Sequence, residues 1–400
     1  MRVPVNPALL LWACERRGWG PEEAAERFAG FPRWVAPGDE HRPPTMKQLQ
    51  EFARATYTPF GYSFLAAPPE EQVPIPDLRT IGDARLSRPS PDLLETIYTC
   101  QSRQAWYHDH ALMEGGGPLP FVGSVAIGSH VVRAATSMRA GLGFELEEQA
   151  RAKSWNDALR SLARHAEEIG ILVMTNGVVG SNTHRRLDPA EFRGFALVDP
   201  IAPVVFVNGA DTKAAQMFTL AHELAHVWAG ATALSDVSAS EPAEATVERW
   251  CNAVAAELLV PLAALRGVVS PSIGESDDEA VLDAAKLLAQ RFKVSTLVAL
   301  RRLFEAEYLA QDRMWSIYRR EHARLVAASK RSQGGGDYYA SKPVRVSRRF
   351  AEAIYVSAWE GRASFTEAMR LLNIKKMATF QELGARLGIQ VEAAGAGDAA

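Results

Sequence analysis

The run from Phe218 to Pro261 constrains this chain more than any other stretch, because it sets metal-binding residue types at helical spacing. Its first half reads FTLAHELAHVWAG, in which His222 and His226 are four residues apart inside an apolar pattern. Residues four apart lie on one face of a helix, one turn above the other. The two imidazoles can therefore hold one metal ion, and Glu223 is close enough to reach a water on that ion.

The second half of the run reads VERWCNAVAAELLVP and supplies a candidate third ligand. Glu248 can complete a site of two histidines and one glutamate, leaving the fourth position to water, as catalytic zinc requires. Asn252 follows four residues later and can orient a ligating imidazole from behind. Pro261 ends this second helix. Three other acidic residues lie on the same side of the chain and remain alternatives for the third ligand: Asp236, Glu241 and Glu244.

A chance occurrence of H-E-x-x-H, or a helix whose histidines only pack, is the competing interpretation. The residues around the motif argue against it, because a helix this apolar would carry three unpartnered polar side chains at a cost. The apolar residues in question are Phe218, Leu220, Ala221, Leu224, Ala225 and Trp228.

FTLAHELAH followed by ERWCNAVAAELLVP resembles the ImmA/IrrE family of metallo-endopeptidases, which are of the gluzincin type. The resemblance implies that His222, His226 and Glu248 bind Zn²⁺ and that Glu223 is the catalytic glutamate. The family more often has Ala and Phe where this chain has Cys251 and Val254. Both replacements remain apolar.

Composition bounds the remaining possibilities. The chain has 400 residues, enough for two or three domains, with 47% hydrophobic and 23% charged residues. A net charge of −3 gives no global sign of nucleic-acid binding, so any DNA contact would need a local basic patch.

The three cysteines indicate the cellular compartment. They are few, far apart and never in a C-x-x-C motif, as is typical of proteins in the reducing cytosol. The apolar run from Ala8 to Ala13 is too short for a signal peptide, and no run reaches the length of a membrane span. We therefore expect a cytoplasmic protein without membrane contact.

The pattern of periodic segments predicts an α+β fold that is predominantly helical, with a small twisted sheet. Three short strands rich in Val, Ile and Phe are expected within 170–176, 193–199 and 202–208. The segment boundaries predict a small helical domain at 1–65, a Pro-rich linker and helical connector at 66–149, a further helical domain at 266–390 and a disordered tail at 391–400. The resemblance to ImmA/IrrE proteins implies a zincin-like peptidase domain at 150–265.

The N-terminal segment predicts several short helices. Pro21 is placed at a first helical position, and Thr45 with Gln48 forms a capping-box pattern. This series resembles an XRE-type helix-turn-helix module. Its recognition segment would be GFPRWVAPGDEHRP, in which Arg33 is the one basic residue before the Pro37-Gly38 break. Groove-reading helices offer several donors, so a protein-binding or packing module is the alternative to DNA contact.

Downstream of Pro261 the chain is expected to be helical. The stretch around FKVS resembles the second helix-turn-helix-like unit of relatives and carries Lys293, Arg301 and Arg302, the alternative being a helical platform over the sheet. The basic helix YRREHARLVAASKRSQ has a solvated face or a phosphate contact as its two interpretations. His108 and His110 are two residues apart and face different sides of a helix, which favours packing or surface roles over a metal pair.

Three hypotheses for function follow. The first is hydrolysis of a peptide bond in a protein partner such as a repressor, within a stress, phage or mobile-element circuit, with Glu223 moving the proton. The second is an antitoxin-like module that neutralises a cognate toxin, often a nuclease, with the zinc fold as scaffold or dormant peptidase. The third is a sequence-specific repressor that binds DNA through its helix-turn-helix modules.

Overall fold

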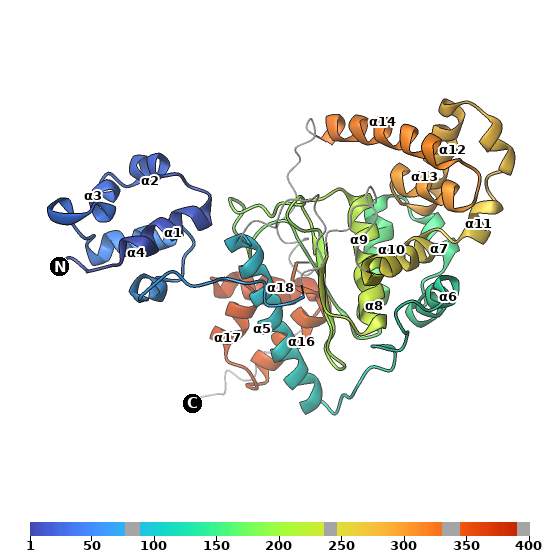
Figure 1. The fold of residues 1–400 in the computed structure, drawn as a ribbon. Helices are drawn as coiled ribbons and strands as arrows, with labels where there is room; N and C mark the ends of the chain where they lie inside the picture. Colours follow the sequence, from blue (N-terminus) through green and yellow to red (C-terminus); the bar gives the residue numbers. More distant parts are fainter. Residues whose placement is uncertain (77–88, 236–245, 330–344, 390–400) are drawn as a thin grey trace, which may run out of the picture. The chain divides into compact units, whose positions relative to one another are not determined.

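A computed structural model describes residues 1–76, 89–235, 246–329 and 345–389 (Figure 1). The chain divides into two compact units, each taken by itself here. The first comprises Met1–Pro74 with Ile81–Ile97, and the second comprises Ile75–Thr80 with Tyr98–Ala400. Helix α5, Pro91–Met113, belongs to both.

The first unit is a set of short helices. Its helical elements are α1 Pro7–Arg17, α2 Pro21–Arg27, α3 Phe31–Val35, α4 Met46–Ala55 and the 3₁₀ turns Gly38–Glu40 and Phe60–Phe64. The predicted capping box is confirmed, since the Thr45 side chain accepts from Gln48 N–H and the Gln48 side chain accepts from Thr45 N–H. Pro21 is the first residue of α2, also as predicted.

Aromatic rings fill the core of this unit. Phe31 and Phe52 stack with their centroids 5.8 Å apart, and Trp34 meets Phe52 edge-on at 5.9 Å. Such pairs add to the free energy of simple apolar burial. The core therefore explains why α3 exists although it has only five residues, since Phe31 and Trp34 are both buried.

A four-stranded sheet lies at the centre of the second unit, within the described residues (Figure 1). Its strands are β1 Leu172–Asn176, β2 Gly194–Leu197, β3 Val204–Asn208 and β4 Ala233–Ser235, in the order β1-β3-β2-β4. β1 pairs parallel with β3, whereas β2 runs antiparallel to both β3 and β4. The three predicted strands are confirmed, and β4 is an addition that the sequence did not indicate.

Alternation along the strands gives the sheet two buried faces. Val173 and Val205 belong to the main core with α8 and α9, while Met174 faces the opposite way, toward Cys100 of α5. Side chains alternate between faces because the strand period is two residues. A sheet that is apolar on both faces needs helices on both.

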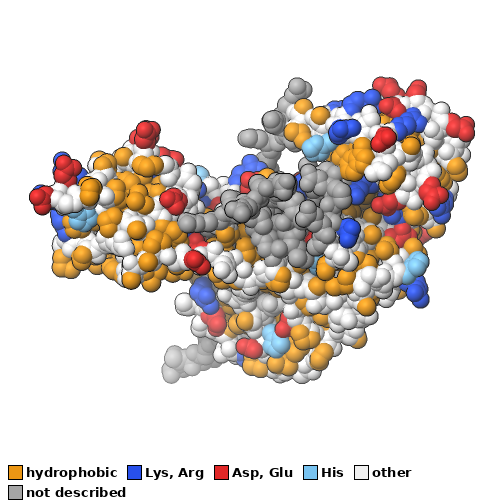
Figure 2. Space-filling view, in the orientation of Figure 1, with side chains coloured by type: hydrophobic (Ala, Val, Ile, Leu, Met, Phe, Trp, Pro, Cys, Tyr) orange, Lys and Arg blue, Asp and Glu red, His pale blue; other side chains and the backbone are white. Residues whose placement is uncertain are grey.

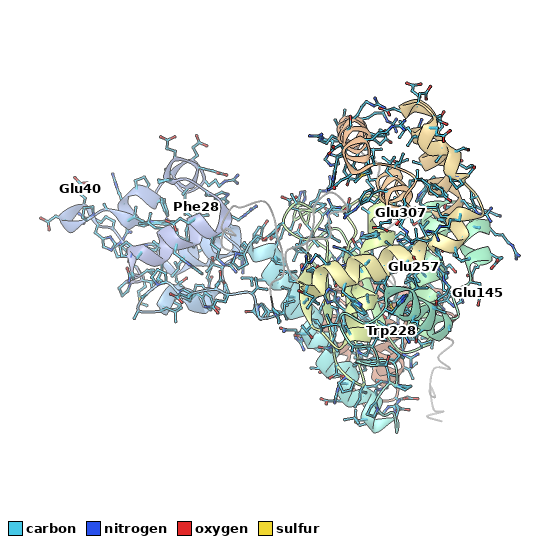
Figure 3. The ribbon with its side chains drawn as sticks, turned by 45° about the vertical axis from the view of Figure 1, so that its right-hand side comes forward. Phe28, Glu40, Glu145, Trp228, Glu257 and Glu307 are labelled. Carbon is cyan, nitrogen blue, oxygen red and sulfur yellow. The ribbon has the colours of Figure 1, made fainter. Side chains whose placement is uncertain are left out.

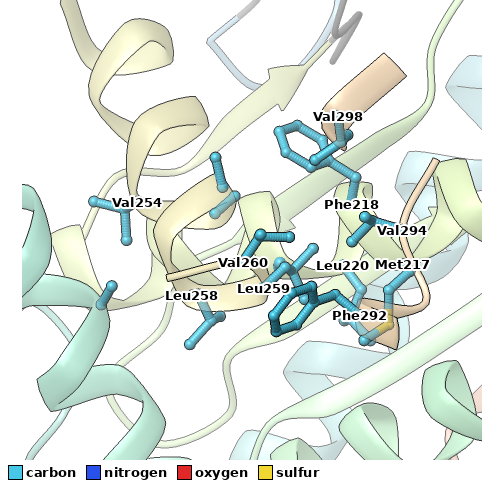
Figure 4. Packing of buried hydrophobic residues seen from close by; sticks show 14 of the residues in the cluster. Met217, Phe218, Leu220, Val254, Leu258, Leu259, Val260, Phe292, Val294 and Val298 are labelled. Carbon is cyan, nitrogen blue, oxygen red and sulfur yellow. The ribbon is translucent and has the colours of Figure 1, made fainter. Parts of the chain in front are cut away.

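On one face lie α8 Trp155–Glu168, α9 Lys213–Ala229 and α10 Thr246–Leu259, with α6 Val131–Leu142 against α10. Figure 4 shows how Phe218 of α9 and Leu259 of α10 pack with Phe292 and Val298 from the next helices. The sequence placed 119–149 in a connector. In the structure this stretch packs on the helices of the motif: Phe121 stacks on Trp228 at 4.6 Å, and α7 Leu146–Arg151 contacts α12.

The opposite face is covered by the second half of α5 and by the C-terminal helices α16 Arg348–Trp359, α17 Phe365–Leu371 and α18 Met377–Leu387. Arg103 of α5 donates to the carbonyl of Leu371 at 2.9 Å, and Trp106 meets Phe350 edge-on at 5.6 Å. Phe350, Ile354 and Leu371 are buried in these helices. The C-terminal helices thus cover the second face of the sheet, although they follow the helices of the first face in the chain.

The segment after α10 comprises α11 Leu262–Arg266, a 3₁₀ turn Pro271–Glu275, α12 Asp278–Phe292, α13 Thr296–Glu305 and α14 Gln311–Ser329. Arg302, a candidate for contact with DNA, is 3% exposed; it forms an ion pair with Glu257 of α10, labelled in Figure 3, and donates to the carbonyl of Val260 at 2.9 Å. α13 packs mainly against α12 and α14, and the Arg302–Glu257 ion pair joins it to α10.

These observations support the predicted α+β class: the described chain is mostly helical with one small mixed sheet. The predicted tail at 391–400 and the acidic alternatives Asp236, Glu241 and Glu244 lie outside the described residues. None of the helices that the structure describes combines the length and apolar character that a bilayer crossing demands.

Candidate metal centre

Helix α9 carries the motif through the middle of the second unit. Thr212 caps its start by accepting from Ala215 N–H, and Gly230 ends it in the left-handed conformation at φ 71°. Residues from Gln216 to Trp228 are all buried, so α9 is enclosed on every side. A helix that is apolar around its whole circumference requires such an environment. The three polar residues of the motif are therefore forced into the interior.

Helix α10 brings Glu248 to the same place. Glu248 lies in the first turn of α10, where the helix dipole favours a negative charge, and it is 3% exposed. α10 packs along α9, and Trp250 fixes α10 from its other side by donating to the carbonyl of Ser129 at 2.9 Å. Contact with the neighbouring helices thus sets the direction in which Glu248 points.

The three candidate ligands converge. His222 Nε2 and His226 Nε2 are 3.0 Å apart, and the carboxylate of Glu248 lies 3.2 Å from the first and 3.1 Å from the second. Within the described residues this is the one group of His, Cys, Asp or Glu side chains arranged as a metal site. The predicted pair of helices therefore does bring two imidazoles and one carboxylate together.

The donor set fits a divalent ion. A tetrahedral zinc ion with bonds of about 2.0–2.2 Å keeps its donor atoms roughly 3.3–3.6 Å apart, within a few tenths of an ångström of these separations. A carboxylate this deeply buried is also costly without a compensating cation. Residues His222, His226 and Glu248 thus have the chemistry and the spacing to hold one ion.

Electrostatics favour the ligating protonation states. Burial lowers the pKa of His226 and favours its neutral imidazole, while the hydrogen bond to Glu248 and, to a smaller extent, that to the backbone of Ala231 act in the opposite direction. Burial alone would raise the pKa of Glu248, but hydrogen bonds with His222 and His226, together with the charge these rings carry when protonated, lower it to about 2. Neutral imidazole and ionised carboxylate are the forms that bind metal.

Glu223 lies one residue beyond the first ligand and is fully buried. Its carboxylate is directed toward β2, where a Cβ placed on Gly194 would be 2.9 Å from Glu223 Oε1. The sequence predicted that Glu223 lies beside the ion. It did not predict that Gly194 of β2 lies against Glu223, because the only sign of this contact is a glycine within a strand pattern. Such a glycine often marks a close backbone approach.

Two neighbours of the site behave differently from the ligands. Asn252 is half-buried, and within the described part of the chain its Oδ1 and the Nδ1 of His222 have no hydrogen-bond partner. The expected role of Asn252, to orient a ligating imidazole, stays a prediction.

Burial raises the pKa of the Cys251 thiol, with the charges of Glu248 and Glu223 adding to the effect, so Cys251 is a neutral packing residue.

His108 and His110 lie away from this centre, as expected. His108 Nδ1 is 2.9 Å from Asp199 Oδ1, and His110 stacks on Trp106 with ring centroids 5.1 Å apart. His108 thus forms a local hydrogen bond, and His110 packs against an aromatic ring.

Comparison with known families bears on the segment just described. No curated protein matches the chain. A family model described as a domain of unknown function, DUF8813, matches residues 346–386, which contain α16 and α17 and most of α18. Residues 166–304, about a third of the chain, match the peptidase family model described as the IrrE N-terminal-like domain, which supports the resemblance to ImmA/IrrE proteins.

Proposed function

We propose that this chain is a zinc-dependent metallo-endopeptidase that cleaves a protein partner. The convergence of His222, His226 and Glu248 beside a buried Glu223 carries the proposal. The family match over residues 166–304 supports peptidase chemistry at this place in the chain. When bound, a zinc ion supplies a Lewis acid that polarises a peptide carbonyl and makes water more acidic.

The protein's own residues divide the remaining work. His222 and His226 would hold the ion from α9, and Glu248 would hold it from α10 and balance part of its charge. Glu223 takes a proton from the attacking water and delivers it to the leaving amine, as a general base and then a general acid. The enclosed helices exclude bulk water, which strengthens each electrostatic interaction at the site.

The test begins from the purified chain and its Glu223→Gln variant. Each is incubated with the product of the neighbouring gene, with and without a chelator, and fragments are identified by mass spectrometry. We expect cleavage by the parent chain, none by Glu223→Gln and none after chelation, with one zinc per chain in both proteins. Cleavage that survives Glu223→Gln would contradict the assigned base.

A second candidate is favoured by one observation. His222, Glu223 and His226 are 0% exposed, so none of the three presents an open surface to a peptide. In this alternative the protein is an antitoxin-like binder whose peptidase fold recognises a toxin without cutting it. A stable complex with the neighbouring gene product, unchanged by Glu223→Gln and free of fragments, would support it.

The charged side chains on one face bear on the choice of partner. On the face drawn in Figure 2, Lys and Arg side chains over α12–α14 are interspersed with Asp and Glu, which forms no basic stripe. In the N-terminal unit, the exposed side chains of α3 are those of Pro32 and Arg33. We propose that this unit, whose helices resemble an XRE module, binds protein; selective, salt-dependent binding of an operator in a gel shift would instead support the repressor hypothesis.

A further inference from the structure

Strand β2 crosses α9 at Gly194, directly above the motif. A Cβ at this position would lie 2.6 Å from Cγ2 of Thr219, 2.9 Å from Oε1 of Glu223 and 2.9 Å from the carbonyl oxygen of Phe206. Real Cβ atoms essentially never approach another heavy atom within 3.0 Å. No other amino acid fits here without a shift of one of these three neighbours.

The backbone conformation at position 194 does not require a glycine. Gly194 is absent from the glycines with positive φ, and it lies in a regular antiparallel ladder, opposite Val207 on one side and Ser235 on the other. Any residue can adopt such a conformation, and a glycine inside a strand weakens it. The close approach of α9 is therefore the reason for a glycine at this position.

The three neighbours differ in how easily they move. The carbonyl of Phe206 belongs to β3 and is held by the sheet, and Thr219 is 2% exposed within α9. The Glu223 carboxylate is the end of a flexible side chain, so it yields first. A methyl group at position 194 would drive it away from β2.

We propose that Gly194 is a positioning residue for the general base: its missing side chain lets the backbone of β2 form the wall against which the Glu223 carboxylate is held. The catalytic consequence rests on the proposed peptidase function. Displacement of a catalytic group by about 1 Å can lower a rate on the order of a hundredfold. The steric contact itself is a property of the fold and can be tested without catalysis.

The first experiment uses metal-free protein and thermal unfolding. Gly194→Ala is compared in three backgrounds: the parent chain, Glu223→Ala, which removes the carboxylate, and Thr219→Ser, which removes Cγ2. We expect the loss of Tm caused by Gly194→Ala to be smaller in the Glu223→Ala background than in the parent chain, because contacting residues are energetically coupled. Equal losses in the parent and Glu223→Ala backgrounds would overturn the proposal.

The second experiment measures cleavage of the partner by zinc-loaded protein. Gly194→Ala combined with Thr219→Ser should retain zinc and KM while its kcat falls about a hundredfold, the expected effect of a displaced base. Ala196→Ser, on the same face of β2, adds one atom away from Glu223 and should keep kcat. Full recovery of kcat in the Gly194→Ala, Thr219→Ser double variant would mean that Gly194 serves packing alone.

The experiments distinguish failure of the peptidase proposal from failure of the Gly194 proposal. If the parent chain cleaves no partner, the peptidase function fails, yet the unfolding measurements still decide whether Gly194 and Glu223 are coupled. If the parent cleaves and no coupling or kcat loss appears, the role of Gly194 fails and the peptidase function stands.

Discussion

At the residue scale, the centre depends on side chains whose identity is set by chemistry and whose enclosure is set by packing. His222 and His226 follow helical spacing, so any helix over this run places them on one face. Glu248 differs, because its position depends on how α10 crosses α9. The sequence offered four acidic candidates for the third ligand, and the structure brings Glu248 to within 3.2 Å of both imidazoles.

The third ligand can be tested by substitution. Substitution of residues that hydrogen-bond to metal ligands typically lowers metal affinity about 10–100-fold. Glu248→Ala should lower zinc affinity by more than this, because it removes a ligand itself. Metal content and competition with a chromophoric chelator measure this. Glu244→Ala serves as the matched control and should leave affinity unchanged; the reverse ranking would assign the ligand to residues 236–245.

At the element scale, the join between α8 and α16 contains an unusual carboxyl group. Glu167, near the end of α8, accepts from Ser347 Oγ at 2.5 Å and from Arg348 N–H at 2.8 Å, at the start of α16. Burial raises the pKa of Glu167 to about 7, although these hydrogen bonds act to lower it. This join ties the segment matching the domain of unknown function to the peptidase-like segment.

The raised pKa of Glu167 predicts a pH dependence of folding. Because the folded state keeps this proton up to about pH 7 while the unfolded chain releases it near its ordinary value, the stabilising contribution is complete at low pH and is lost as pH rises through 7. Between pH 5 and 8, the parent should lose about 1–3 kcal/mol of unfolding free energy relative to Glu167→Gln. Urea denaturation at both values measures the difference; parallel pH profiles for the two proteins would contradict the prediction.

At the scale of the whole molecule, the second unit is completed by residues distant in sequence. The C-terminal helices cover the sheet face formed by Met174 and its neighbours, and α5 reaches that face from before the sheet. Both segments pack against the sheet through the face opposite α9.

Deleting residues 345–400 should therefore disrupt folding of the second unit. Phe350 is fully buried, and Phe350→Ala alone should cost about 3–5 kcal/mol. Circular dichroism during thermal unfolding measures both changes, and Glu352→Ala, on the exposed side of α16, is the control. A cooperative, unaltered transition in the truncated chain would show that the helices are dispensable.

Local rules were sufficient for much of the organisation. The capping box at Thr45, the start of α2 at Pro21, the three strands rich in Val and Phe and the end of α10 before Pro261 follow from short-range preferences. β4 was missed because three residues, Ala233–Ser235, carry no periodicity of their own and become a strand by pairing with β2. The role of α6 was missed because its contacts are with α10, far along the chain.

By itself the sequence determined the two helices, the spacing of the imidazoles and the choice of ligand types, because helical period and side-chain chemistry are properties of adjacent residues. Tertiary structure alone decided that Glu248 meets the imidazoles, that Arg302 is buried in an ion pair, and that β2 passes over Glu223 at a glycine. Those outcomes depend on how helices and strands pack across long separations, and packing is a collective result that no single segment encodes.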